Sequence, residues 1–474
     1  MNMDMDKNQI KQDIHQLFKR QRDAFYHTPI PDLKQRQDLL QRLHRLLVEN
    51  KNRLVEAITN DFGHRSRDEI LLTILLLIEE INYAKKNLHQ WMQPKKRKIS
   101  ALIQFAYAKL IPQPLGVIGI FAGWNEPLLL SIGPLIGALA AGNRVMIKAA
   151  TLLSATNQLL NDLFSRYFSP TEVCFVLETI PHVKRIFSHL PFDHVLFTGS
   201  SRTGRIIMRA ASYHLTPVTL ELGGKSPAII ATDANLEAAT DKIICSKLYN
   251  SGQICIASDY VLLPTGEENE FINLAKKVVA KRYPTVFNNP DYTCIINEDH
   301  MRRLQQYLED ATAKGATVIP LSQEKDMIHA GKMSPVIILN AKPGMLVMEE
   351  EIFGPILPIV TYPNLQAAVE FINQRPKPLA LYYFGKDENQ INYVIKNTFS
   401  GGVTINDALL HFTQPSLPFG GVGASGMGNY HGEYGFNTFS KLKPVVYQRR
   451  FNFSSMIFPP YSKLYRLLLQ LKIR

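Results

Sequence analysis

The sequence predicts an α/β protein built from two doubly wound parallel-sheet domains. After Pro112, short apolar strands alternate with helices, a pattern typical of βαβ units. The alternation pauses near Glu221 and restarts at Pro227, which indicates a second domain. A chain of 474 residues is also too long for one ordinary core. Open parallel sheets bind ligands beyond the carboxyl ends of their strands, so we expect a site at that edge.

Helices precede the first sheet. Leucines at helical spacing predict helix through residues 7–61, and an apolar helix over 68–91 ends before Pro94. Residues 98–110 alternate loosely and are predicted to form a strand of a small accessory hairpin. The first sheet should contain strands at 116–121, 144–148, 173–176, 193–197 and 218–220, with helices at 128–141, 152–167 and 202–211.

The second domain repeats the pattern with a strand at 228–230, a helix from 236 and a strand at 260–263, continuing to a strand at 381–384. The segment from Gly401 must pack back on the earlier domains. Residues 461–474 predict a short basic amphipathic helix, for which docking on a partner subunit is favoured over membrane contact. We therefore divide the chain into a cofactor-binding domain (1–221, with 95–112 in a bridging hairpin), a catalytic domain (222–405) and a return segment with a C-terminal bridging tail (406–474).

Composition excludes several classes of protein. The net charge is +12, but the basic residues are spread along the chain, so nucleic-acid binding is not expected. The only dense basic run, residues 95–98, is interpreted as a solvated loop. The uncharged segment 127–143 is interrupted by proline and glycines, which favours a buried helix over a membrane span.

The four cysteines form no CxxC pair and no Cys/His metal spacing. We therefore expect neither a disulfide framework nor a metal site. The acidic, polar N-terminus predicts no secretory signal. These features favour a reducing, cytoplasmic location.

One loop carries a candidate nucleophile. Cys255 ends the segment Tyr249-Asn-Ser-Gly-Gln-Ile-Cys255, which is predicted to form a loop between a helix and a strand. Upstream, Glu221 ends an apolar strand and is followed by two glycines. A reactive thiol needs a neighbouring base or an electropositive setting, because the thiolate is the attacking species. The alternative is a buried structural cysteine and an ordinary strand-end carboxylate.

Other polar groups follow predicted strands. Gly199 and Ser200 open a helix after an apolar strand, where backbone N–H groups would face an anion. Asn125 offers an amide that can stabilise an oxyanion, although a turn asparagine is commoner. Lys148 could hydrogen-bond a ribose or simply be solvated. The G-x-G-x-x-G match at 421–426 has no strand before it and is rejected as a dinucleotide fingerprint.

Together, four motifs resemble those of the aldehyde dehydrogenase superfamily: residues 221–227 (ELGGKSP), 250–255 (NSGQIC), 350–355 (EEIFGP) and 418–423 (PFGGVG). They occur in the family's order, and the resemblance spans roughly residues 30 to 450. Segments 401–407 and 425–432 look most like the class 3 branch and, within it, the coniferyl aldehyde dehydrogenases.

The resemblance implies catalytic roles for three residues. Cys255 would form a thiohemiacetal, Asn125 would stabilise its oxyanion, and Glu221 would activate the water that hydrolyses the thioester. It also implies an NAD or NADP cofactor, with Lys148 at the adenosine ribose, Gly199 and Ser200 at the pyrophosphate, Glu351 at the nicotinamide ribose, and Trp124 and Phe353 beside it.

Two residues depart from the family pattern. Glu126 stands where the family has a substrate-tunnel tyrosine, and we expect it to face away from Asn125, since an inward carboxylate would disfavour a second negative charge. Thr151 replaces the glutamate that holds the adenosine ribose and repels a 2′-phosphate. The sequence therefore predicts a relaxed preference between NAD and NADP.

We therefore expect an NAD(P)-dependent oxidation of apolar or aromatic aldehydes to carboxylic acids, and the class 3 resemblance implies a homodimer. CoA-acylating dehydrogenases and acyl-phosphate reductases are alternatives, although neither needs a water-activating base such as Glu221. A catalytically weakened nucleotide-binding scaffold remains open because of the departures at Glu126 and Thr151.

Overall fold

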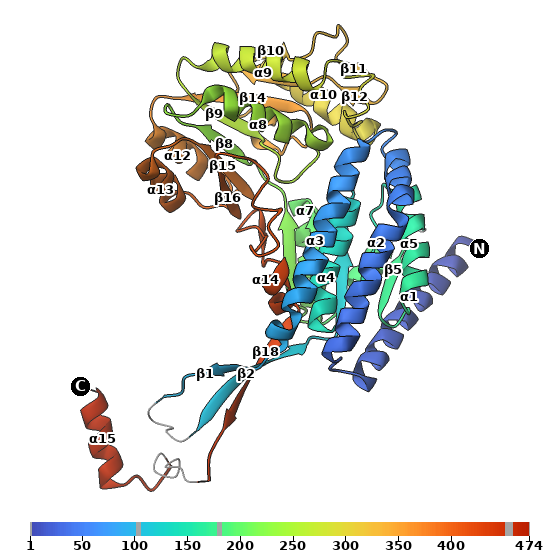
Figure 1. Ribbon diagram of the computed structural model, residues 1–474, viewed down its shortest axis with the longest axis vertical. Helices are drawn as coiled ribbons and strands as arrows, with labels where there is room; N and C mark the ends of the chain where they lie inside the picture. Colours follow the sequence, from blue (N-terminus) through green and yellow to red (C-terminus); the bar gives the residue numbers. More distant parts are fainter. Residues whose placement is uncertain (1, 101–105, 178–182, 451–457, 474) are drawn as a thin grey trace.

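Two α/β bodies and a projecting arm make up the molecule (Figure 1). The computed structural model describes residues 2–100, 106–177, 183–450 and 458–473. The first body is built on a sheet of order β17-β7-β6-β3-β4-β5, whose strands are parallel except β17. These strands are β3 (Val117–Phe121), β4 (Arg144–Lys148), β5 (Val173–Val176), β6 (His194–Gly199), β7 (Val218–Leu222) and β17 (Gly426–Met427).

The N-terminal helical region is broken where the sequence predicted a continuous helix over 7–61. Two helices form instead, because Pro29 and Pro31 interrupt the chain and Asp32 caps the second helix in a capping box with Gln35. The helices of this body are α1 (Asn2–His27), α2 (Leu33–Asp61), α3 (Arg67–Met92), α4 (Pro127–Ala141), α5 (Ser154–Tyr167), α6 (Val183–Ser188) and α7 (Ser201–Ser212).

The second body has a sheet of order β10-β13-β14-β9-β8-β15-β16, parallel except for β10. Its strands are β8 (Pro227–Ile230), β9 (Tyr260–Pro264), β10 (Thr317–Pro320), β13 (Val336–Leu339), β14 (Ile356–Tyr362), β15 (Ala380–Phe384) and β16 (Gly402–Ile405), with a small hairpin of β11 (Ile328–His329) and β12 (Lys332–Met333). Its helices are α8 (Leu236–Leu248), α9 (Glu268–Arg282), α10 (Glu298–Ala313), α11 (Leu346–Glu349), α12 (Leu365–Asn373) and α13 (Glu388–Asn397).

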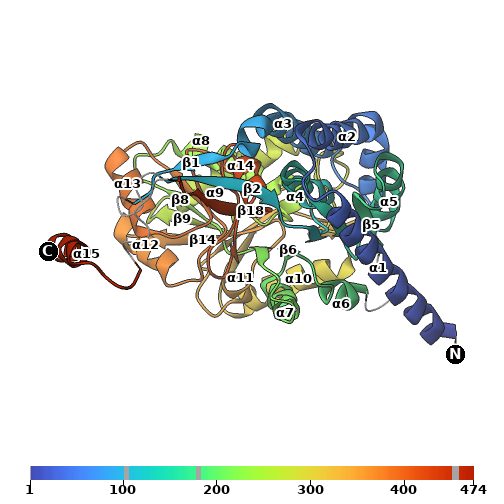
Figure 2. The same cartoon turned by 90° about the horizontal axis from the view of Figure 1, so that it is seen from below.

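The arm is an antiparallel sheet of β1 (Lys95–Arg97), β2 (Tyr107–Pro114) and β18 (Ser440–Tyr447). The prediction of a loop at 95–98 is wrong for β1, which is an exposed strand paired with β2. Residues 101–105 of the predicted strand lie outside the described part. Beyond the arm, α15 (Lys463–Ile473) has no buried residue. Figure 2 shows α15 and the start of α1 projecting from opposite ends of the molecule.

The return segment closes the first sheet. Strand β17 pairs antiparallel with β7, with Gly426 opposite Glu221, and the Leu222 N–H donates to the Ser425 carbonyl at 3.0 Å. α14 (Gly432–Thr438) then packs on α4, which is buried over almost its whole length, as predicted for residues 127–143. Among the helices described, we find none with the length and apolar character needed to cross a membrane.

Candidate active site

The loop that carries Cys255 has an unusual backbone. Asn250 and Ser251 adopt left-handed conformations (φ 48° and 51°) in the short 3-10 turn η2 (Tyr249–Gly252) that ends α8. Gly252 has φ +77°, and a Cβ at this position would lie 2.4 Å from the Gly354 carbonyl oxygen. Because side chains avoid such conformations, only a glycine fits here without displacing the neighbouring chain.

Buried hydrogen bonds hold this loop in place. The Gln253 side-chain amide donates to the carbonyls of Asn250 and Cys294, both at 3.0 Å, and its oxygen accepts from the Ile296 N–H at 3.0 Å. The Asn125 Nδ2 donates to the Gln253 carbonyl at 3.1 Å. The candidate oxyanion amide is thus tied to the chain two residues before Cys255.

Cys255 and Asn125 lie where two cavities meet. A larger cavity, about 540 Å³, and a smaller cavity, about 380 Å³, have only these two residues in common among the residues that line them. The thiol can therefore be approached from two sides. All nine predicted site residues line the larger cavity: Cys255, Glu221, Asn125, Trp124, Lys148, Gly199, Ser200, Glu351 and Phe353.

Glu221 is a buried acid without compensation. Its side chain is 3% exposed, and neither carboxylate oxygen has a hydrogen-bond partner among the described residues. Burial raises its pKa well above the ordinary value, since the charged form loses hydration without gaining a donor. Such a group is a stronger base than a solvated carboxylate, as a water-activating residue must be.

The Cys255 thiol lies in an electronegative setting. Burial and then the carboxylates of Glu351 and Glu221 raise its pKa above the ordinary value. Among the described residues, no cation lowers the pKa of this thiol. The thiol is therefore protonated in the resting enzyme. Before it can attack a carbonyl, the thiol must lose its proton. Since no cation assists, a neighbouring base must accept that proton.

Glu351 lies against the backbone after β7. Its carboxylate occupies the space beside Gly223, where a Cβ would be 2.0 Å from an oxygen, so a side chain at position 223 would displace this carboxylate. Burial, followed by the nearby Asp259 carboxylate, raises the pKa of Glu351 to about 8. The Arg303 guanidinium donates to the Ile352 carbonyl at 2.8 Å and fixes this segment.

Aromatic rings close one side of the larger cavity. The rings of Trp124 and Phe353 are 5.5 Å apart in an edge-to-face arrangement, and Trp124 also contacts His300 at 5.0 Å. Phe353 has φ 50°, a strained conformation that fixes the direction of its ring.

The other end of the larger cavity suits an anionic nucleotide. Ser200 caps α7 by accepting from the Thr203 N–H at 3.4 Å, and no acidic residue lies in the first turn of this helix. Lys148 ends β4 and is 4% exposed, with its Nζ donating to the Ala149 carbonyl at 2.9 Å. The volume, the helix N-terminus and the absence of a carboxylate at Thr151 fit a dinucleotide with or without a 2′-phosphate. No group of three or more metal-ligating side chains occurs in the described residues.

The smaller cavity is mainly apolar. Its wall comes from helices α3 and α4 and from the return segment, and also includes the ion pairs Lys242–Asp407 and Arg282–Asp241. Sequence reasoning missed these residues, because leucines on helices carry no signal beyond an ordinary core. The apolar lining is Leu72, Leu76, Leu129, Leu130, Ile254, Ile256, Leu409, Leu410 and Phe412.

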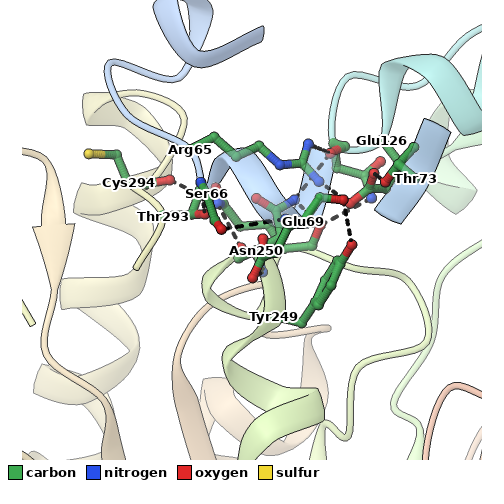
Figure 3. A network of polar contacts seen from close by, with 11 residues as sticks. Arg65, Ser66, Glu69, Thr73, Glu126, Tyr249, Asn250, Thr293 and Cys294 are labelled. Carbon is green, nitrogen blue, oxygen red and sulfur yellow. Dashed lines mark hydrogen bonds and ion pairs between the residues drawn. The ribbon is translucent and has the colours of Figure 1, made fainter. Parts of the chain in front are cut away.

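Glu126 does not face away from the site, so that expectation is wrong. It is 6% exposed and lines the smaller cavity together with Asn125 and Cys255. Its charge is matched by an ion pair with the buried Arg65, and Thr73 donates to its second oxygen at 3.4 Å (Figure 3). The partner explains how a carboxylate is tolerated at this buried position.

Comparison with known proteins identifies the class. The model of the aldehyde dehydrogenase family matches residues 6–445, and the chain belongs to this family. It is therefore an NAD(P)-dependent enzyme that oxidises aldehydes, and the predicted family, fold class and cofactor are confirmed.

Particular relatives narrow the position within the family. The chain is 50% identical to a probable coniferyl aldehyde dehydrogenase of Pseudomonas aeruginosa, covering 96% of each chain. It is 39% identical to mouse aldehyde dehydrogenase family 3 member A2, over 94% of this chain and 91% of the other. A substrate-bound structure of Staphylococcus aureus AldH superimposes with a TM-score of 0.91 at 34% identity, covering 97% and 99% of the two chains.

Proposed function

We propose that this enzyme oxidises apolar, aromatic aldehydes such as coniferyl aldehyde to carboxylic acids, using Cys255 as the nucleophile. The observation that carries the proposal is the junction of the two cavities at Cys255 and Asn125. The larger and more polar cavity, suited to a dinucleotide, and the apolar cavity, suited to a planar, largely apolar aldehyde, reach the same thiol from different sides.

Cys255 transfers its thiol proton to a nearby base, and its sulfur attacks the aldehyde carbon to form a thiohemiacetal. Glu221, the strongest candidate base lining the same cavity, has lost its hydration and lacks hydrogen-bond donors. The Asn125 amide stabilises the negative charge on the former carbonyl oxygen, a role that typically contributes about 10²–10³ in rate.

The larger cavity supports NAD or NADP binding. We assign Lys148 to the adenosine ribose, Gly199 and Ser200 to the pyrophosphate at the N-terminus of α7, and Glu351 to the nicotinamide ribose, with Trp124 and Phe353 beside the ring. Bound there, the cofactor supplies the oxidant that accepts hydride from the thiohemiacetal carbon. Glu221 first releases the thiol proton to solvent, and its carboxylate then deprotonates the water that hydrolyses the resulting thioester.

Glu221 also favours hydrolysis over the alternative reactions. A CoA-acylating enzyme or an acyl-phosphate reductase transfers the acyl group to a thiol or a phosphate and needs no water-activating base. A buried, unpaired carboxylate costs folding free energy. Its retention beside the thiol is understandable if it performs a chemical step, which also disfavours a catalytically weakened scaffold.

The test is NAD(P)H formation with a panel of aliphatic and cinnamyl-type aldehydes. We expect turnover by the wild type, highest with aromatic aldehydes, and none by Cys255→Ala. The matched control is Cys174→Ala, a buried cysteine of β5 that lines neither cavity. Turnover by the Cys255 variant would exclude the thiol mechanism. Binding of NAD without turnover of any aldehyde would favour the scaffold alternative.

We assign cofactor binding to residues 1–221, catalysis to residues 222–405, and bridging between subunits to the hairpin and the tail.

We also propose a homodimer in the cytoplasm. The arm and α15 support the dimer, because α15 exposes Leu464, Leu467 and Leu471 and buries nothing within its own chain. The free cysteines support a reducing compartment.

Light scattering in solution tests the dimer. We expect twice the 53.7 kDa chain mass for the wild type. Replacing Leu467 and Leu471 with glutamate should weaken the dimer without unfolding the chain, since both side chains are exposed. A monomeric wild-type protein would contradict the proposal.

A further inference from the structure

A buried polar network binds the backbone of Asn125. Arg65, in the turn between α2 and α3, is 2% exposed. Its Nη1 donates to the Asn125 backbone carbonyl at 2.8 Å, while its Nη2 pairs with the Glu126 carboxylate. One guanidinium therefore binds two consecutive residues after β3, and Figure 3 shows its contact with Glu126.

The second half of the network comes from the nucleophile loop. The Asn250 Nδ2 donates to the same Asn125 carbonyl at 3.1 Å, and the Asn250 N–H donates to the Glu69 carboxylate at 3.1 Å. Arg65 and Asn250 thus hold the Asn125 carbonyl from two sides, and Glu69 anchors Asn250. The network joins the loop of the thiol to the loop of the candidate oxyanion amide.

One observation and one general property of buried ion pairs indicate that this arrangement serves position as well as charge balance. The Arg65 Nε has no hydrogen-bond partner among the described residues, so the guanidinium is not placed to satisfy all its donors. Replacing a buried ion pair with apolar side chains is often neutral or stabilising, so stability alone gives little reason to keep a pair here. What apolar side chains cannot supply is the hydrogen bond to the Asn125 carbonyl.

We propose that Arg65 and Glu126 form a positioning pair, which fixes the backbone of Asn125 and aims its side-chain amide at the oxygen that becomes negative during attack by Cys255. The inference rests on the proposed oxyanion role of Asn125. Glu126 orients the guanidinium, and Arg65 transmits that orientation to the carbonyl one residue earlier. Neither residue touches the reacting atoms.

The test replaces the pair with apolar side chains, Arg65→Met with Glu126→Leu, in the full-length enzyme. The double change removes both charges of the pair. Glu69 loses the attraction of Arg65 but keeps the hydrogen bond from the Asn250 N–H, so we expect a folded protein that melts below the wild-type temperature by a few degrees. We expect kcat at saturating aldehyde to fall about ten- to a hundredfold, because a small displacement of a catalytic group lowers the rate by about this factor. The affinity for NAD and the alkylation rate of Cys255, which do not use the amide, should stay within about twofold.

Glu126 lines the smaller cavity, so the double variant can also change the KM for the aldehyde. The test is therefore decided by kcat. The matched control is Arg42→Met with Glu172→Leu. This partly exposed ion pair links α2 to the residue before β5, with Nη1 to Oε2 at 2.8 Å, and neither residue lines either of the two cavities. Its kcat should equal that of the wild type. A single Arg65→Lys variant keeps the charge but cannot span both acceptors, and its kcat should fall at least tenfold.

Asn125→Ala separates this inference from the proposed function. If Asn125→Ala loses kcat while both Arg65 variants keep it, the positioning role is overturned and the oxyanion role stands. If Asn125→Ala turns over at the wild-type rate, the oxyanion assignment itself is wrong. If the double variant does not fold, the Arg65→Lys result decides alone.

Discussion

Replacing Glu221 with glutamine is expected to stop the enzyme after a single turnover. The substitution keeps the size of the side chain but removes the base, while Cys255 and Asn125 are unchanged. A positioned general base contributes about 10²–10⁴ in rate, or about 3–5 kcal/mol of barrier. Steady-state kcat should fall by that factor. One NAD(P)H per Cys255 should still appear, more slowly than in the wild type, because the thiol must then lose its proton to water instead of to Glu221.

The same change should stabilise the fold in a pH-dependent way. The Glu221 carboxyl is buried without donors, so its folded pKa lies above its unfolded value of about 4.3. Below the unfolded pKa both states hold the proton, and the neutral carboxyl contributes fully to stability. As the pH rises through the raised folded pKa, this contribution is lost. Glutamine does not titrate, so the advantage of the variant should grow from pH 5 to pH 8.

Two measurements check this reasoning. Rapid mixing with a cinnamyl-type aldehyde follows the burst of NAD(P)H, and mass spectrometry of the quenched protein detects the acyl group on Cys255. Urea unfolding at the two pH values gives the stability difference. Undiminished steady-state turnover, or a stability difference that is equal at both pH values, would refute the account of Glu221. Wild-type kcat should itself rise with pH as the carboxyl ionises.

Three further changes test the larger cavity and the nucleophile loop. Thr151→Glu should increase the preference for NAD over NADP in kcat/KM at least tenfold from a wild-type ratio below about a hundred, because a carboxylate and a phosphate about 5 Å apart in water repel by about 1–2 kcal/mol; an unchanged ratio would show that residue 151 lies away from the ribose. Gly252→Ala should destabilise the protein by more than the roughly 1 kcal/mol expected from its φ of +77° alone, because the new Cβ would also clash with the Gly354 carbonyl. Urea unfolding measures the loss, and the control is Gly315→Ala, at a position with φ +89° and nothing within 4 Å. Gly223→Ala should displace the Glu351 carboxylate and weaken NAD binding about tenfold, the worth of one hydrogen bond to a charged group, with little change in melting temperature; calorimetric titration measures the affinity, and wild-type affinity would remove Glu351 from the cofactor site.

Most of the first sheet could be predicted because its signals are local. Strands β3 and β4 are short apolar runs bounded by glycine, and both were predicted within a residue. The break between α1 and α2 was missed because helical periodicity resumes on both sides of Pro29 and Pro31. Strand β1 was missed because its lysines face solvent on both sides, which resembles a loop in sequence.

The residues of the candidate site were predicted only through motifs. The sequence suggested Cys255, Glu221 and Asn125 as separate groups, and the structure brings them to one cavity. The Arg65–Glu126 pair carried no signal, since its partners are 61 positions apart and each residue alone resembles a surface charge. Such pairs are set by tertiary packing, which single-residue patterns do not report.

The pairing of Gly426 with Glu221 has a consequence for biosynthesis. Strand β7 lies inside the first sheet only after β17 has joined it from a segment about two hundred residues later in the chain. A nascent chain that stops before residue 426 leaves β7 at the edge of the sheet, so that the candidate base lies on a strand paired with β6 alone. Loops closed over such distances form slowly. Activity should therefore emerge late on the ribosome, after the segment that carries Cys255 has long been synthesised.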